Sequence, residues 1–333
     1  MTSWFLASDP VLPAQLLPAT VLDAGLGRGV DAQRLLAGTR LFPEDLYAPD
    51  CRLSTAQTVR LLQNLEREVA GRDTFFRLGA LAAPVALGPV GPLVSSARTL
   101  GDAVRALVAY RRLYLPCLQL RTVRAGADLW LLLDDAGGAA PAWRALAETF
   151  AAMLVELLRE LDGARPEATW LFAHREPAHL EQYHEAFGTR LLFDAPVTAV
   201  RLPGDRLDRP LAGASTVRRR IARRTCAEAR RAQDPGPGFV EAVRGRLARC
   251  ERRAAAIVPI AEHFGMSPAT FKRRLKEHDV RFQALADHAA LERALELMLL
   301  RGCSPEAANR ILGFTDPSNF RRAFKRWTGR RPT

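Results

Sequence analysis

The stretch LGFTDPSNFRRAFKRWTG, residues 312–329, combines four Arg or Lys residues with a series of large aromatic ones. Phe320, Phe324 and Trp327 recur at the spacing of one helical face, and they predict a stripe that is buried in a core. Polar and cationic residues repeat on the opposite side of the same helix, at Ser318, Arg321, Arg322 and Lys325. The segment therefore predicts an amphipathic helix that has one aromatic and one cationic face.

Two residues mark the start of this helix. Asp316 is a preferred N-cap, and Pro317 suits the first turn because a missing N–H group costs nothing there. A single basic helix is more often a solvated surface helix than a binding surface. A second copy of the pattern would reverse that preference.

A second copy lies upstream, in AEHFGMSPATFKRRLKEH, residues 261–278. Ser267 is its expected N-cap and Pro268 its first helical residue. Phe271 precedes Phe320 by 49 positions, and the cationic residues of the two segments align at the same interval. Each segment has a short helical stretch before it, so the sequence predicts two helix-turn-helix units.

The two units are joined by RFQALADHAALERALELMLLRG, residues 281–302. This connection has no Pro and no internal Gly, and its apolar positions recur at helical spacing. A single long helix is predicted. The C-terminal part of the chain is therefore expected to be an all-α tandem held by one rigid connection.

These motifs resemble the DNA-binding domain of the AraC/XylS family of bacterial transcription regulators, over residues 239–331. The second motif, at 312–332, matches the family almost letter by letter. Upstream, the resemblance is carried by Ala261, Gly265, Met266, Ser267, Phe271, Arg273, Leu275, Phe282, Leu291 and Ala294.

The resemblance implies that the first turns of the two recognition helices face DNA bases. Arg and Lys can donate hydrogen bonds to guanine O6 and N7, while Ser, Thr and Asn near helix N-termini can contact phosphates or bases. Two recognition helices joined by one rigid connecting helix would enter successive major grooves about 34 Å apart. The expected DNA-binding residues are Ser267, Ala269, Thr270, Lys272, Arg273, Lys276, Pro317, Ser318, Asn319, Arg321, Arg322 and Lys325.

Two positions depart from the family pattern. The small Ala of the first helix in the second unit is replaced by Asn309, and the interhelical Arg of the long helix is replaced by Ala290. We expect the second unit to pack or to contact DNA less tightly for this reason.

The charge distribution agrees with a nucleic-acid module at the C-terminal end. Residues 236–333 hold 19 Arg or Lys against 10 Asp or Glu, and residues 201–233 hold 10 against 3. The first 200 residues hold 19 against 22, although the whole chain has a net charge of +12. Such an asymmetry indicates a DNA-binding domain joined to one of another kind.

Composition excludes several other classes of protein. No apolar run reaches membrane-spanning length and the N-terminus lacks a signal-peptide pattern, so a cytoplasmic protein without membrane contact is expected. The five cysteines share no short spacing and are expected to be reduced. G-x-S-x-G, H-E-x-x-H, P-loop and C-x-x-C motifs are absent. We therefore expect no enzyme activity, no catalytic residue, no metal and no cofactor.

The N-terminal part is predicted to be α+β. Helices are expected at 54–71, capped by Ser54, and at 141–162 and 177–187, and the first hundred residues are expected to be largely helical. Strands are expected at 129–133 and 168–173, with one or two more at 191–202.

Residues 95–114 and 183–200 resemble the arabinose-binding type of N-terminal domain found in one branch of the same family. The resemblance implies a domain that senses a small-molecule effector or forms a homodimer. An alternative is a protein-interaction module bound by an antagonist or coactivator. The resemblance also implies activation of transcription through contact with RNA polymerase, the usual mode of action in the family.

The expected domain limits follow composition. Residues 1–205 form the sensing or dimerisation domain, 206–238 a basic linker that ends in the helix-breaking DPGPG, and 239–333 the DNA-binding domain. Five arginines of the linker, between 218 and 224, either contact phosphates or belong to a solvated helix.

Overall fold

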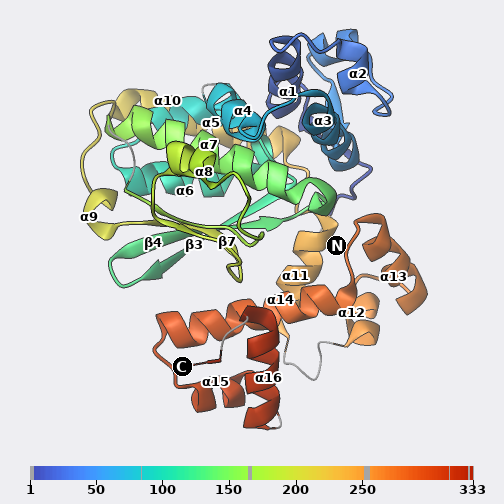
Figure 1. Cartoon of the computed structure of the whole chain (residues 1–333), viewed down its shortest axis with the longest axis vertical. Coiled ribbons are helices and arrows are strands. Elements are labelled where there is room, and N and C mark those ends of the chain that lie inside the picture. The colour runs from blue at the N-terminus through green and yellow to red at the C-terminus, as the bar shows by residue number, and fades with distance from the viewer. Residues whose placement is uncertain are drawn as a thin grey trace.

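The computed structural model describes residues 4–83, 85–163, 167–250, 256–314, 316–328 and 331–332 of the chain (Figure 1). An N-terminal part of mixed helices and strands lies at one end, and an all-helical part lies at the other. The α+β and all-α classes predicted from the sequence are confirmed. The exact domain limits stay a prediction.

A five-stranded mixed sheet forms the centre of the N-terminal part. Its strands follow the order β3-β4-β7-β5-β6, and all neighbours are antiparallel except β5 and β6. The strands are β3 (Leu118–Ala125), β4 (Asp128–Asp135), β5 (Thr169–Leu171), β6 (Leu191–Leu192) and β7 (Thr198–Leu202). Along β4, Leu129, Leu131 and Leu133 are buried at alternate positions, as the period of a strand requires.

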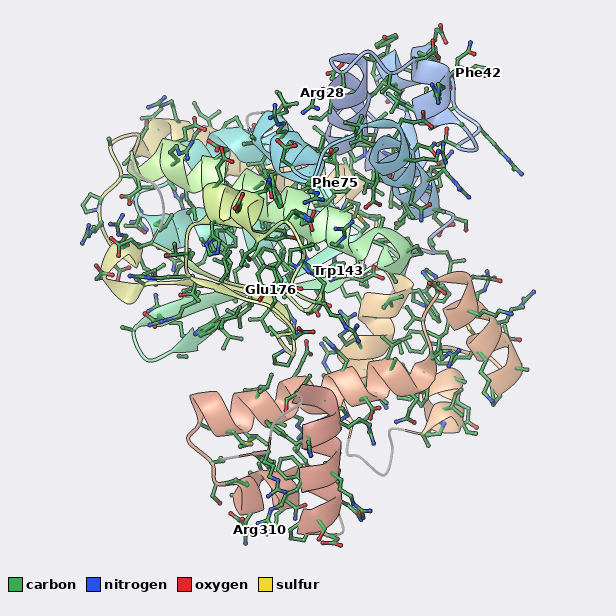
Figure 2. All side chains as sticks on the ribbon, viewed as in Figure 1. Arg28, Phe42, Phe75, Trp143, Glu176 and Arg310 are labelled. Atoms are coloured by element: carbon green, nitrogen blue, oxygen red, sulfur yellow. The ribbon has the colours of Figure 1, made fainter. Side chains whose placement is uncertain are left out.

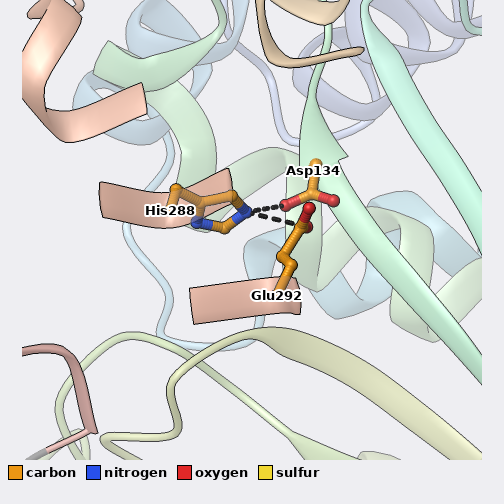
Figure 3. A group of neighbouring side chains, drawn as sticks. All are labelled: Asp134, His288 and Glu292. Atoms are coloured by element: carbon orange, nitrogen blue, oxygen red, sulfur yellow. Dashed lines mark hydrogen bonds and ion pairs between the residues drawn. The ribbon is translucent and has the colours of Figure 1, made fainter. Parts of the chain in front are cut away.

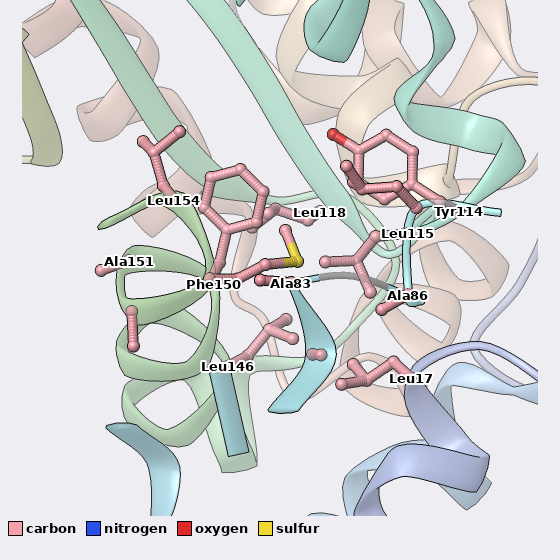
Figure 4. Packing of buried hydrophobic residues seen from close by; sticks show 14 of the residues in the cluster. Leu17, Ala83, Ala86, Tyr114, Leu115, Leu118, Leu146, Phe150, Ala151 and Leu154 are labelled. Atoms are coloured by element: carbon pink, nitrogen blue, oxygen red, sulfur yellow. The ribbon is translucent and has the colours of Figure 1, made fainter. Parts of the chain in front are cut away.

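Helices cover the apolar face of this sheet. The longest is α7 (Trp143–Asp162), which packs against α4 (Thr74–Ala82). Figure 4 shows Phe150 of α7 beside Leu118 of β3, in the same apolar cluster as Leu146 and Leu154 of α7. The other helices of this layer are α5 (Val90–Ser95), α6 (Leu100–Tyr110), α8 (Leu180–Phe187) and α9 (Gly204–Leu207).

A smaller helical layer precedes the sheet in the chain. It holds α1 (Leu17–Leu26), α2 (Ala32–Leu36) and α3 (Thr55–Glu68), with the two-stranded sheet of β1 (Pro10–Pro13) and β2 (Arg52–Ser54). The predicted cap of α3 is confirmed, because Ser54 Oγ accepts a hydrogen bond from the Gln57 backbone N–H at 3.1 Å. Single-turn 3-10 helices lie at η1 (Pro43–Tyr47), η2 (Arg111–Leu113) and η3 (Ala140–Ala142).

The linker is a helix followed by a short segment that packs closely against the N-terminal part. Helix α10 (Thr216–Gln233) packs on α5 through buried Ala222 and Cys226, while Val217 and Ile221 are exposed. The helix-breaking DPGPG segment after it is held by a backbone hydrogen bond, which the Phe5 N–H donates to Pro237 O at 3.1 Å. A Cβ atom on Gly238 would lie 1.9 Å from Ala136 O. Only glycine therefore fits at the point where these two backbone segments approach each other.

The C-terminal part is built from helices alone in the residues that the structure describes. It contains α11 (Phe239–Arg249), α12 (Ile257–His263), α13 (Pro268–Glu277), α14 (Phe282–Leu295), α15 (Pro305–Ile311) and α16 (Pro317–Thr328). Helix α14 continues into a π-helical turn, η5 (Glu296–Leu300), so the predicted long connection is confirmed. In Figure 1, α13 lies near the start of this connection, and α16 runs away from its central part.

Candidate nucleic-acid interface

Helix α13 presents the cationic face predicted for the first unit. Ser267 caps it by accepting a hydrogen bond from the Thr270 N–H at 3.2 Å. Phe271 and Leu275 are buried in the core with 0% and 1% exposure, so the opposite face must point outward. Lys272, Arg273 and Lys276 are exposed, and among the described residues they form no ion pair. Three cationic groups are therefore free to meet an anionic partner.

Helix α16 repeats this arrangement in the second unit. The Asp316 carboxylate accepts a hydrogen bond from the Ser318 N–H at 2.8 Å, and this bond lowers the pKa of Asp316. Phe320 and Phe324 are buried, which confirms the predicted aromatic stripe. Trp327, the third member, is half-buried.

The cationic side chains of α16 are exposed but differ in their partners. Arg321 forms an ion pair with Glu306 of α15 at 3.2 Å, and both side chains are 57% exposed. Arg322 donates to Asn319 Oδ1 at 2.6 Å. Lys325 has no ion pair within the part of the chain that is described. Exposed pairs of this kind contribute little and can open without much cost.

The predicted DNA-binding residues thus fall on two corresponding surfaces. All of them belong to α13, α16 or the cap of α13, and all except Thr270 and Asn319 are exposed. Those two are half-buried because Thr270 Oγ1 accepts a hydrogen bond from Ser267 Oγ at 2.9 Å and Asn319 holds Arg322. The structure brings these residues into place; their contact with DNA stays a prediction.

The long connection holds the second unit through both packing and charge. Arg326 of α16 pairs with Asp287 of α14 at 3.0 Å. Arg293 of α14 donates to the Cys250 carbonyl at 3.3 Å, and beside it Ala290 borders a hollow of about 230 Å³. The departure at Ala290 therefore coincides with open space between α11, α14 and the end of α15.

Asn309, the other departure, is buried without full hydrogen bonding. It lies on α15 with 6% exposure, and its Oδ1 atom has no donor among the described residues. A buried acceptor without a partner costs about 1–3 kcal/mol relative to a satisfied one. A small apolar residue at this position would leave no buried acceptor without a hydrogen bond. The second unit is therefore expected to be less stable with Asn309 than with such a residue. Figure 2 shows Arg310, the next residue, at the outer end of this unit.

The face of the sheet opposite to its core carries charged side chains that meet α14. His288 Nε2 lies 2.9 Å from Asp134 Oδ1 and 3.0 Å from Glu292 Oε1 (Figure 3). Arg121 of β3 donates to both carboxylates, at 3.0 Å to Asp134. We call Arg121, Asp134, Arg244, His288 and Glu292 the interdomain charge cluster.

This cluster has the ligand types of a metal site, but its charges are already balanced. The candidate ligand atoms of Asp134, His288 and Glu292 lie within 4.8 Å of one another. Two guanidinium groups face the two carboxylates, and the hydrogen bonds to Asp134 and Glu292 outweigh burial and raise the pKa of His288 to about 9. Burial raises the pKa of Asp134, yet Arg244, His288 and Arg121 outweigh it and lower the pKa overall. A divalent cation would meet a protonated imidazole and two arginines.

The first unit is attached to the N-terminal part at further points. His278, at the end of α13, is buried and donates from Nδ1 to the Gly137 carbonyl at 3.2 Å. Trp4 lies against Phe239 of α11, with ring centroids 4.9 Å apart. Glu241 of α11 accepts hydrogen bonds from both Arg111 and Arg112.

Sequence reasoning missed these interdomain residues. The partners Arg121 and Glu292 stand 171 positions apart, so no local pattern links them. One signal was present: Asp134 follows Trp130 and Leu132 on the face of β4 that turns away from the buried leucines. Two large apolar residues beside a charged one on that outer face indicate contact with another part of the protein.

Comparisons with known proteins agree with both halves of the chain. Residues 29–211, more than half of it, match the arabinose-binding domain of AraC transcription regulators, and residues 260–333 match a helix-turn-helix domain. The chain is 27% identical over 327 residues to the ornithine utilization regulator of Pseudomonas aeruginosa, covering 96% of each protein. It is 24% identical over 311 residues to the transcriptional regulator VirS of Mycobacterium tuberculosis, covering 91% of this chain and 90% of VirS.

A crystal structure of the transcriptional regulator CdpR from Pseudomonas aeruginosa aligns with 94% of this chain and 95% of its own, with a TM-score of 0.46 and 19% identity. None of the described helices is long and apolar enough to cross a membrane. All five cysteines are free, as expected. The matched domains and relatives are transcription regulators, a class without enzyme activity. The chain belongs to the AraC family of transcription regulators.

Proposed function

We propose that this regulator binds one promoter site through α13 and α16, placed in successive major grooves. The observation that carries the proposal is the pair of exposed cationic faces on two helices that are joined by one continuous helical connection. Successive major grooves on one side of DNA lie about 34 Å apart. One chain would then recognise a long site without internal symmetry.

Within each face, we assign different roles to different side chains. Arg273 and Arg322 lie in the second turns of their helices, and we propose that they donate hydrogen bonds to guanine bases in the major groove. Lys272, Lys276 and Lys325 would contact phosphates, which supply affinity that depends on salt.

We further propose that the N-terminal domain controls how the DNA-binding domain is presented, in response to a small-molecule effector. The buried contacts between the two parts support this control, because a ligand that favours one arrangement would change DNA affinity. The usual outcome in the family is activation through RNA polymerase. Action on promoter DNA would place the protein in the cytoplasm.

A second candidate function is favoured by the packing of the N-terminal core. Two cavities lined wholly by residues of this domain measure about 10 Å³ each, room for about one water molecule. A packed core suits a module that binds an antagonist, a coactivator or a second copy of the chain on its surface. Neither of these two cavities has room for a small-molecule effector.

The DNA-binding proposal is tested by selecting fragments of the source genome with the purified full-length protein. A few upstream regions that share one long motif are expected, and Arg322→Ala should lose or degrade that motif. Arg310→Ala is a matched control, because Arg310 is exposed on α15 of the same unit but lies outside the proposed surface. Enrichment without a motif for all three proteins would contradict sequence-specific binding.

A further inference from the structure

We propose that the cleft between the two domains and the linker binds a small organic anion, a carboxylate or a phosphate ester, as the effector. The proposal rests on the proposed effector control and names the site and the chemical class. The cleft has a volume of about 330 Å³ and is bordered by the end of α6, by η2 and β3, by α10 and by Glu241 of α11. This volume lies within the usual range for small-molecule sites, about 300–1,000 Å³.

The charge of the lining selects an anion. Four guanidinium groups border the cleft, against the two carboxylates of Asp234 and Glu241. The arginines are Arg111, Arg112, Arg121 and Arg230. Arg121 is already paired with Asp134 and Glu292, and Arg112 also pairs with Asp234 at 3.7 Å, so Arg230 is the cation of this lining without a carboxylate partner among the described residues. Guanidinium groups bind carboxylates and phosphates through paired hydrogen bonds.

Arg111 shows that the balance is incomplete. Its side chain is 9% exposed and bonds to Glu241, which it shares with Arg112 at 3.1 Å. Burial lowers the pKa of Arg111, and the carboxylate of Glu241 only partly offsets that effect. In addition, Arg112 Nε is buried and has no acceptor among the described residues. An added anion would accept a hydrogen bond from this N–H group.

Arg230 offers a free cation at the same cleft. Its guanidinium carbon lies 5.3 Å from the centre of the Tyr110 ring, and it forms no ion pair within the described residues. Contact with an aromatic ring holds the guanidinium in place but leaves its N–H groups available. Arg230 belongs to the linker, whereas Arg111 and Arg112 belong to the N-terminal domain, so one ligand would contact both parts.

Occupation of the cleft would act on the DNA-binding domain through Glu241. An anion bound to Arg111 and Arg112 competes with the Glu241 carboxylate for the same N–H donors. Weakening these bonds loosens the start of α11, which packs against α14. The ligand therefore favours an arrangement in which the DNA-binding domain is released from the N-terminal domain.

The test uses the full-length protein and two probes, succinate and glycerol 3-phosphate, with neutral succinamide as a reference. Binding is measured by calorimetry for the wild type, Arg230→Gln and Arg231→Gln. Arg231 is the adjacent exposed residue of α10 and does not border the cleft, so it controls for net charge. At least one dianion should bind the wild type saturably, and the succinate and phosphate arms tell which class fits better.

Arg230→Gln should weaken binding about tenfold or more, while Arg231→Gln leaves it unchanged. Bound probe should also increase hydrogen exchange in α11. The proposal is overturned if neither dianion binds saturably, or if both variants lower affinity equally. DNA binding of each protein is measured without probe. If DNA binding is intact and specific but no probe binds, the ligand site in the cleft is rejected and the DNA-binding proposal still stands.

Discussion

The two helix-turn-helix units share one sequence pattern but are supported differently. The first shares its core with α11 and with Trp4 from the far end of the chain, and His278 ties it to Gly137. The second has a separate, smaller core and a buried Asn309 that lacks a donor. A repeated recognition surface thus does not imply repeated stability. The first unit depends on the N-terminal part, and the second depends on its own packing and on α14.

The largest expected effects come from one buried phenylalanine in each unit. Phe271 and Phe324 are both buried, so either change to Ala should cost about 3–5 kcal/mol of unfolding free energy. Phe324→Ala should unfold the second unit alone, whereas Phe271→Ala should also loosen α11 and the contact at His278. Hydrogen exchange resolved by segment distinguishes the two cases. Equal exchange in both units for both variants would refute the separate cores.

Next in size are the proposed base contacts. Arg273→Ala and Arg322→Ala should each cost about 1–3 kcal/mol in binding a selected DNA site and much less in binding unrelated DNA. The effect of Arg322→Ala should be the smaller one if Asn309 loosens the second unit. Titrations at several salt concentrations check this. If each variant reduces only the salt slope, both residues are phosphate contacts.

A stabilising change is expected at Asn309. Asn309→Ala removes an unsatisfied buried acceptor and should raise the unfolding free energy of the second unit by about 1 kcal/mol. Asn64 provides the opposite case, because it is buried and its Nδ2 donates to Leu35 O at 2.7 Å and Ala37 O at 2.8 Å. Asn64→Ala should therefore destabilise the protein. Denaturant titrations measure the free energy of unfolding of both variants. If both substitutions raise it, or both lower it, relative to the wild type, this reasoning is contradicted.

The last expected effect is a pH dependence of the interdomain charge cluster. The pKa of His288 is raised from 6.5 to about 9, so its stabilising contribution is complete below pH 6.5 and is lost as the pH rises through about 9. The difference in melting temperature between the wild type and His288→Gln should accordingly shrink between pH 6.5 and pH 9. A difference that stays constant over this interval would mean that His288 is not protonated in the cluster.

Much of the C-terminal part was predictable because its signals are local. Ser267 and Asp316 cap their helices, and Phe271 and Phe320 mark the buried faces, all within one or two turns of chain. The same holds for Ser54, whose capping box starts α3. Local hydrogen bonds and helical periodicity suffice for such elements.

The missed elements depend on distant partners. Strands β1 and β2 lie within the stretch expected to be largely helical and are defined by pairing with each other, about forty residues apart in the chain. Strand β3 was missed as well, although its partner β4 was predicted. The interdomain charge cluster likewise joins residues of β3, β4, α11 and α14 that no single segment brings together.

The most direct test of the account is a footprint of the full-length protein on one selected promoter fragment, repeated with Arg273→Ala and Arg322→Ala. Two protected major-groove segments are predicted, centred about one helical turn apart. Each variant should lose base preference in one segment and keep it in the other. A single protected segment, or the same change in base preference for both variants, would contradict the claim that the two units contact successive grooves.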